Sequence, residues 1–161
     1  MRHSTRLLIS LALSVLNAAA IAAPGLLIFE IDAVKLDSQG EPTRTGDFLT
    51  GYALRNLSTK KSSAFLYARG VQAEEMEEGV YCVDSITIGR NNSFEFCNEP
   101  YFRVTAGRMN NAGHWRFGIA SDLSTAKMVH AVKYADETMS TARTQRAEEI
   151  ARFIGKLNVK D

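Results

Sequence analysis

The sequence predicts a mostly β protein: a single antiparallel β-sandwich of about seven or eight strands with a C-terminal amphipathic α-helix. Short apolar segments recur along the chain and are bounded by Gly, Asn or Pro, as is typical of strands in a sandwich. A stripe of apolar residues at helical spacing lies near the C-terminus. The composition, 45% apolar and 23% charged, resembles that of ordinary globular proteins and excludes a disordered or collagen-like chain.

Residues 1–22 are expected to be a secretory signal peptide. Two arginines precede an apolar run, Leu7–Leu16, and the triplet at 20–22 matches the small-x-small pattern of a cleavage site. The mature chain then begins at Ala23 and forms one domain, residues 23–161. An uncleaved membrane anchor is the alternative, but the apolar segment is at the short limit for crossing a bilayer. We therefore expect a periplasmic or secreted protein with no stable membrane anchor.

The net charge argues against nucleic acid as a partner. The chain has 19 basic and 18 acidic residues, and loss of Arg2 and Arg6 with the signal peptide changes the net charge from +1 to −1. A near-neutral chain has no overall electrostatic attraction to nucleic acid or to anionic lipid.

Strands are predicted in order along the mature chain. Over residues 27–33, apolar residues alternate with Glu30 and Asp32, the pattern of a half-buried strand with a charged outer face. Residues 70–79 contain four glutamates and are expected to form a solvated loop. The remaining predicted strands are bounded by turn residues and span 48–57, 63–68, 80–88, 93–97, 101–106, 115–120 and 126–134.

Cys82 and Cys97 are expected to form a disulfide. An even number of cysteines in an exported chain favours pairing, because the compartment does not reduce the bond. If residues 89–90 form a two-residue hairpin loop, the two cysteines lie directly opposite each other. The same register opposes Asp84 to Glu95, an unfavourable like-charge pair, so the disulfide is a firmer prediction than the register. Two free buried thiols are the alternative.

A second hairpin is predicted between residues 101–106 and 115–120. Its register pairs Phe102 with Phe117 on one face and Arg103 with Arg116 on the other.

A C-terminal helix is predicted over about 136–157, with Asp136 as its N-cap. Its apolar stripe, at i, i+3, i+4 and i+7, consists of Ile150, Phe153, Ile154 and Leu157. A single helix over 125–157 is the alternative, because the apolar residues at its start also fit a helical period. We expect a strand followed by a helix.

Three segments resemble a recurring pattern of exported bacterial proteins, in which a G-x-Y strand is followed by a P-x-F-x-V-x-x-G strand and a Gly-aromatic strand. The segments are Gly79–Cys82, Pro100–Gly107 and Gly113–Ile119. The pattern is similar to prealbumin-like (transthyretin-like, carboxypeptidase-regulatory-like) β-sandwich modules. This resemblance implies a β-sandwich that is generally non-catalytic, and it implies no mechanism.

Tyr101, Arg103, His114 and Arg116 form a candidate surface binding patch. In the predicted hairpin they share one outer face, with the two guanidinium groups side by side. Adjacent like charges are favourable only when solvated, paired with carboxylates or occupied by an anion. Aromatic residues together with arginine are also typical of protein interfaces. The expected partner is a protein or a small anionic ligand in the cell envelope, and an ordinary solvated face is the alternative.

No catalytic residue, cofactor or metal site is predicted. The motifs H-E-x-x-H, C-x-x-C, G-x-S-x-G and G-x-G-x-x-G are absent, as is a phosphate-binding loop. Two S-x-x-K strings occur, at 58–61 and 124–127. Such a pair activates a serine nucleophile when a helix begins at the serine, but these strings lie in a predicted turn and before a predicted strand. His130 is expected to be structural.

These patterns together predict an exported, non-catalytic binding or interaction protein of the cell envelope. A periplasmic inhibitor or immunity protein is the alternative among binding functions. A small serine hydrolase using Ser124 and Lys127 is the alternative among enzymes.

Overall fold

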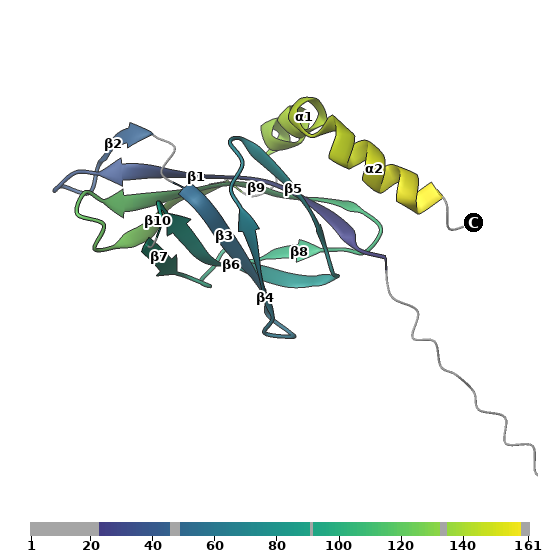
Figure 1. Ribbon diagram of the computed structural model, residues 1–161, viewed down its shortest axis with the longest axis horizontal. Coiled ribbons are helices and arrows are strands. Elements are labelled where there is room, and N and C mark those ends of the chain that lie inside the picture. Colours follow the sequence, from purple (N-terminus) through teal and green to yellow (C-terminus); the bar gives the residue numbers. More distant parts are fainter. Residues whose placement is uncertain (1–22, 46–48, 91, 133–134, 159–161) are drawn as a thin grey trace, which may run out of the picture.

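A computed structural model describes residues 23–45, 49–90, 92–132 and 135–158 (Figure 1). The predicted signal peptide lies outside the described residues. Within them the elements follow in the order β1 (Gly25–Leu36), β2 (Pro42–Thr45), β3 (Leu49–Asn56), β4 (Ser62–Leu66), β5 (Val71–Met76), β6 (Gly79–Ile88), β7 (Asn92–Glu95), β8 (Phe102–Val104), β9 (Met109–Ala120), β10 (Ala126–Val132), α1 (Asp136–Gln145) and α2 (Ala147–Asn158).

The strands form two five-stranded sheets. In the first sheet the order is β10-β9-β1-β2, and β5 also pairs with β1; in the second it is β4-β3-β6-β7, and β8 also pairs with β6. This arrangement confirms the prediction of a mostly β protein with two sheets. The prediction of a wholly antiparallel sandwich is wrong, because β1 runs parallel to β9 in a mixed first sheet. The described residues contain ten strands rather than seven or eight.

The parallel pair lies at the centre of the first sheet, where β1 is buried on both faces. Leu26, Leu27, Ile28 and Phe29 are successive residues of β1, and each is at most 2% exposed. Parallel strands are typically covered on both faces, and their sequences then read as continuous apolar runs. The apolar run at the start of β1 is therefore the sequence feature that fits a central strand of a mixed sheet.

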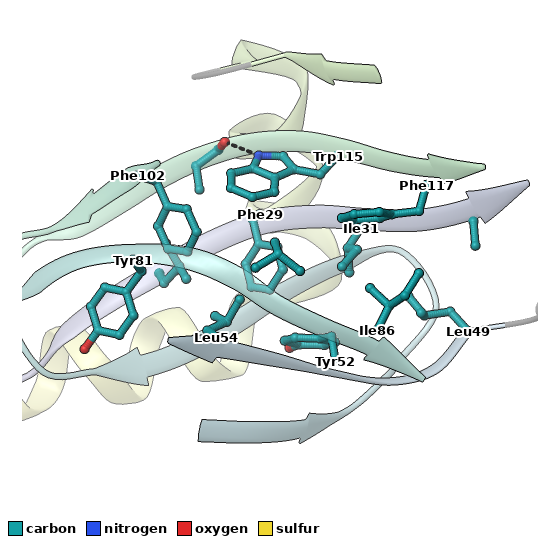
Figure 2. Packing of buried hydrophobic residues seen from close by; sticks show 14 of the residues in the cluster. Phe29, Ile31, Leu49, Tyr52, Leu54, Tyr81, Ile86, Phe102, Trp115 and Phe117 are labelled. Carbon is teal, nitrogen blue, oxygen red and sulfur yellow. Dashed lines mark hydrogen bonds between the residues drawn. The ribbon is translucent and has the colours of Figure 1, made fainter. Parts of the chain in front are cut away.

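The main core fills the space between the two sheets, as Figure 2 shows. It includes Phe29 and Ile31 of β1, Trp115 and Phe117 of β9, Tyr52 and Leu54 of β3, and Ile86 of β6. The indole N–H of Trp115 donates to the backbone oxygen of Ala112 at 2.8 Å, which satisfies its one polar group inside the core.

The predicted hairpin between residues 101–106 and 115–120 is wrong. β8 pairs with β6 in the second sheet, and β9 pairs with β1 in the first. Phe102 and Trp115 do meet, with ring centroids 5.1 Å apart, but they meet across the core from opposite sheets. A strand shows the same alternation of apolar and polar residues whether its contact partner is a neighbour in the same sheet or lies across the core in the other sheet. The alternation therefore does not distinguish the two arrangements.

The disulfide between Cys82 and Cys97 is confirmed, with the two Cα atoms 4.9 Å apart. The predicted register is wrong by one residue, because Glu95 lies opposite Ser85 rather than Asp84. Asp84 instead makes an ion pair with Arg55 on β3. The like-charge contact that made the register unfavourable is thereby avoided.

Residues 71–76, predicted to lie in a loop, form β5 along the edge of the first sheet. Its buried residues are Val71, Gln72 and Met76. The glutamates of this segment are accommodated because one edge of β5 is not paired with a described strand.

Two helices cover the outer face of the first sheet (Figure 1). Ala142, Ile150 and Phe153 pack on Leu26, Ile28 and Val71 in a second apolar cluster. The predicted order, strand then helix, is confirmed, and the alternative of one helix over 125–157 is wrong because β10 pairs with β9. The predicted helix is interrupted at Arg146, and Ala135 rather than Asp136 occupies the N-cap position of α1. Neither described helix is long and apolar enough to span a bilayer.

Candidate functional site

The structure divides the predicted binding patch between two sheets. Arg103 lies on β8 and is exposed, and Tyr101 precedes β8 with 37% of its surface exposed. His114 and Arg116 lie on β9 in the other sheet. The pairing of Arg103 with Arg116 is wrong, because Arg103 opposes Val80 and Arg116 opposes Asp32.

Around His114 and Arg116 the structure forms a polar group that we call the Asp32 cluster: Asp32, His114, Arg116 and His130. Arg116 donates to both carboxylate oxygens of Asp32, with Nε–Oδ1 at 2.9 Å and Nη2–Oδ2 at 2.7 Å. The Nε2 atom of His114 lies 3.4 Å from Oδ2 of the same carboxylate. The ring of His130, on β10, lies 6.0 Å from that of His114.

The electrostatics of the Asp32 cluster favour an ionised carboxylate. Burial acts to raise the pKa of Asp32, but the nearby His114 and the hydrogen bonds and charge of Arg116 outweigh it and hold that pKa below its ordinary value. The Asp32 carboxylate, 3.4 Å from Nε2, raises the pKa of His114 against the effect of partial burial. Arg116 therefore already has a carboxylate partner. The cluster links β1, β9 and β10 and is not an open anion site.

A second polar pair lies at the opposite edge of β1. The hydroxyl of Tyr52, on β3, donates to Oε1 of Glu74, on β5, at 2.9 Å. Burial raises the pKa of Glu74, and the hydrogen bond from Tyr52 only partly offsets this effect. Glu74 thus holds its proton to a higher pH than an exposed glutamate does. No sequence pattern indicated this pair, because all four glutamates were expected in a solvated loop.

A hollow lies between α2 and the start of the described chain. We call it the α2 hollow. It has a volume of about 560 Å³ and is lined by Ala23, Pro24, Arg152, Phe153, Gly155, Lys156 and Leu157. Pro24, Phe153 and Leu157 supply an apolar lining. Gly155 also lines the hollow, and a Cβ atom at this position would meet nothing within 4 Å.

Two basic side chains lie one helical turn apart at the rim of the α2 hollow. Lys156 binds Oε1 of Glu75 through its Nζ atom at 2.6 Å, which fastens α2 to β5. Arg152 is exposed and makes no ion pair or side-chain hydrogen bond with the described residues. Its guanidinium therefore has five N–H donors available to a ligand.

The apolar stripe of the C-terminal helix is only partly buried. Ile150 and Phe153 are buried, whereas Ile154 is 43% exposed, and both Phe153 and Leu157 line the hollow. The sequence contained one signal of this site. Gly155 lies within the last turns of the helix, where glycine is unfavourable unless space or function requires it.

Neither S-x-x-K string begins a helix. Ser58 lies in the turn after β3, and the hydroxyl of Ser124 donates to Oδ1 of Asp122 at 2.7 Å in the turn before β10. Lys127 lies on β10. The helical turn that would bring serine and lysine together is thus not formed at either place. Among the described residues, no three His, Cys, Asp or Glu side chains are grouped as metal ligands.

Comparison of the chain with protein-family models, with curated proteins and with solved structures finds no match. Function must therefore be argued from the geometry and chemistry of the site.

Proposed function

We propose that the chain is exported and is a non-catalytic binding protein of the cell envelope, which binds a small anionic amphiphile in the α2 hollow. The observation that carries this proposal is an open apolar hollow of about 560 Å³ with two basic side chains at its rim. Small-molecule sites typically have volumes of about 300–1,000 Å³, an apolar lining and a few convergent polar groups.

The lining favours a ligand with an apolar tail and an anionic head. Each methylene group that leaves water for the surface of Phe153 and Leu157 contributes about 0.8 kcal/mol. Arg152 matches a carboxylate or phosphate head, because its planar guanidinium can donate two parallel hydrogen bonds. Lys156 adds positive charge at the same rim, although its Nζ atom is already bound to Glu75.

Export and binding are connected at Ala23, which lines the hollow. If the signal peptide is removed after residue 22, the new α-amino group lies at the hollow. With an ordinary pKa of about 7.7–8.0, this group is mostly protonated at neutral pH. Cleavage therefore adds a positive charge at the hollow that Arg152 also lines, and we expect the mature chain to bind an anionic head more tightly than the precursor does.

Two further observations support export and a binding role. The disulfide between Cys82 and Cys97 is of the kind that persists in oxidising compartments. The resemblance to prealbumin-like modules, carried by residues 79–120, implies a non-catalytic β-sandwich.

Titration of the exported protein with a fluorescent long-chain fatty acid tests the proposal. We expect saturable binding that a fatty acid displaces more effectively than the corresponding alcohol. Arg152→Gln is expected to weaken binding about tenfold, because an exposed charged hydrogen bond contributes about 1.4 kcal/mol. Gly155→Phe should abolish binding by filling the hollow.

Arg143→Gln is the matched control, since Arg143 is also an exposed helical arginine but does not line the hollow. It should leave the affinity unchanged. Absence of saturable binding, or equal loss in Arg143→Gln and Arg152→Gln, would contradict the proposal.

A further inference from the structure

β4 forms one edge of the second sheet, and among the described residues it pairs with β3 alone. The strands at the other sheet edges each carry a feature that discourages pairing with another chain, namely a proline, a charged residue or very short length. These features are Pro42 in β2, Glu74 and Glu75 in β5, Glu95 in β7, Arg103 in β8 and Lys127 in β10. β4, with the sequence Ser-Ser-Ala-Phe-Leu, has no charged residue and no proline.

Among the described residues, no strand bonds to the backbone groups on the outward edge of β4. Asn56 N–H donates to the oxygen of Lys61, and Tyr67 N–H donates to the oxygen of Thr50, so residues 61 and 67 bond toward β3. Hydrogen bonding alternates along an antiparallel strand. The N–H and C=O groups of Ala64 and of its neighbours two residues away therefore point away from the sheet.

The side chains of β4 leave this edge accessible while holding the strand in place. Leu66 is 88% exposed, and Ala64 is also exposed. On the inner face, the ring of Phe65 stacks on that of Tyr52 with centroids 5.3 Å apart. The helices pack on the first sheet and not on β4 (Figure 1). Phe65 thus holds β4 against the core, while the outward edge of the strand stays accessible to another chain.

We propose that β4 pairs with β4 of a second copy of this chain, forming a continuous sheet through a two-fold symmetric dimer. An antiparallel pair centred on Ala64 places Leu66 of one copy opposite Ser62 of the other, and Lys61 opposite Tyr67. No charged residue faces a like charge in this register. The segment is therefore complementary to itself, as an interface between identical surfaces requires.

This dimer is independent of the α2 hollow, because β4 belongs to the second sheet and α2 packs on the first. Loss of dimerisation and loss of ligand binding are consequently separable results. A dimer would display two hollows on one particle.

Sedimentation equilibrium from about 1 to about 500 µM tests the dimer. We expect a concentration-dependent dimer, and we expect Leu66→Lys to raise its dissociation constant at least about tenfold, since an edge lysine opposes strand addition. Val132→Lys is the matched control, because Val132 is 40% exposed on the edge strand β10. It should leave the dissociation constant unchanged. A monomer at every concentration, or equal weakening by the two variants, would overturn the proposal.

Cross-linking gives a second readout that does not depend on the strength of the dimer. Residues directly opposite in a hydrogen-bonded antiparallel pair have Cα atoms about 5.5 Å apart, within reach of a disulfide. Ala64→Cys should therefore form a covalent dimer on mild oxidation. Ser58→Cys, in an exposed turn, should not. Equal yields from the two variants, or no dimer from Ala64→Cys, would contradict pairing through β4.

Discussion

Asp32→Asn removes the carboxylate that joins β1 to β9. Asp32 accepts hydrogen bonds from Nε and Nη2 of Arg116 and lies 3.4 Å from Nε2 of His114. Asparagine has nearly the same shape but no charge, so Arg116 and His114 lose their counterion without leaving a cavity. The variant therefore isolates the electrostatic contribution of the Asp32 cluster to stability.

The expected loss of stability depends on the geometry of the Asp32–Arg116 ion pair and on the partial exposure of its two side chains. A hydrogen bond to a charged group contributes about 1.5–3 kcal/mol when it is well shielded from water. The side chains of Arg116 and Asp32 are 35% and 25% exposed, so solvent screening reduces this contribution. We expect Asp32→Asn to lower the free energy of unfolding by about 1–2 kcal/mol near pH 5.5.

The loss should depend on pH. Because the pKa of His114 is raised in the folded protein, its contribution is complete below 6.5, its ordinary value, and is lost as the pH rises through the folded pKa. Because the pKa of Asp32 is lowered, its contribution is complete above 3.8 and is lost as the pH falls through the folded pKa. The difference between wild type and variant should be largest between these values and smaller near pH 9, where the pair with Arg116 remains.

Urea unfolding followed by tryptophan fluorescence measures this difference. Trp115 is the single tryptophan, is 1% exposed and lies between His114 and Arg116 on β9. Glu41→Gln is the control, because Glu41 is exposed and forms no ion pair with the described residues. A difference for Asp32→Asn within about 0.3 kcal/mol of zero, or one that grows toward pH 9, would refute the reasoning.

Three further variants test other parts of the fold by the same unfolding measurement. Replacing Cys82 and Cys97 together by alanine should lower the free energy of unfolding by about 3 kcal/mol, and an unchanged midpoint would count against this contribution. Gly155→Ala should raise it by about 0.5–1 kcal/mol, because the new Cβ meets nothing within 4 Å; a loss would show that the space is closed. Tyr52→Phe should cost about 1 kcal/mol and raise the pKa of Glu74, which carboxyl NMR measures; a lowered pKa would contradict the role of this hydrogen bond.

The existence of most strands could be predicted from the sequence, but their partners could not. Alternation of apolar and polar residues reports which face of a strand is buried, and Phe102 and Trp115 are indeed both buried. It does not report whether two buried faces belong to one sheet or to two. Phe102 and Trp115 therefore satisfied a hairpin register and yet meet across the core.

Two charged residues lie in surroundings other than those predicted. Glu74 was expected in a loop, but it lies on an edge strand and is half-buried against Tyr52. Arg116 was expected beside Arg103, but it faces Asp32 through a parallel pairing that strand alternation alone does not reveal. The disulfide could be predicted despite the wrong register. That prediction rested on the even number of cysteines in a chain expected to be exported and on the closeness of their two strands, and it did not require one exact register.

The α2 hollow depends on which part of an apolar stripe the helix buries. Periodicity predicts the stripe but not how far the sheet extends beneath it. Phe153 and Leu157 both pack on the cluster that contains Leu26 and Ile28, and both also line the hollow beside Pro24. Such a site depends on the relative lengths of the helix and of the strands beneath it. A local sequence pattern does not give these relative lengths.

Native mass spectrometry of the protein recovered from the periplasmic fraction tests export and ligand binding together most directly. We predict a chain that begins at Ala23, carries the Cys82–Cys97 disulfide and retains a noncovalent anionic amphiphile that Arg152→Gln releases. A chain that keeps Met1 in the cytosol, with both thiols reduced and no such ligand, would contradict the proposed export and the proposed binding role.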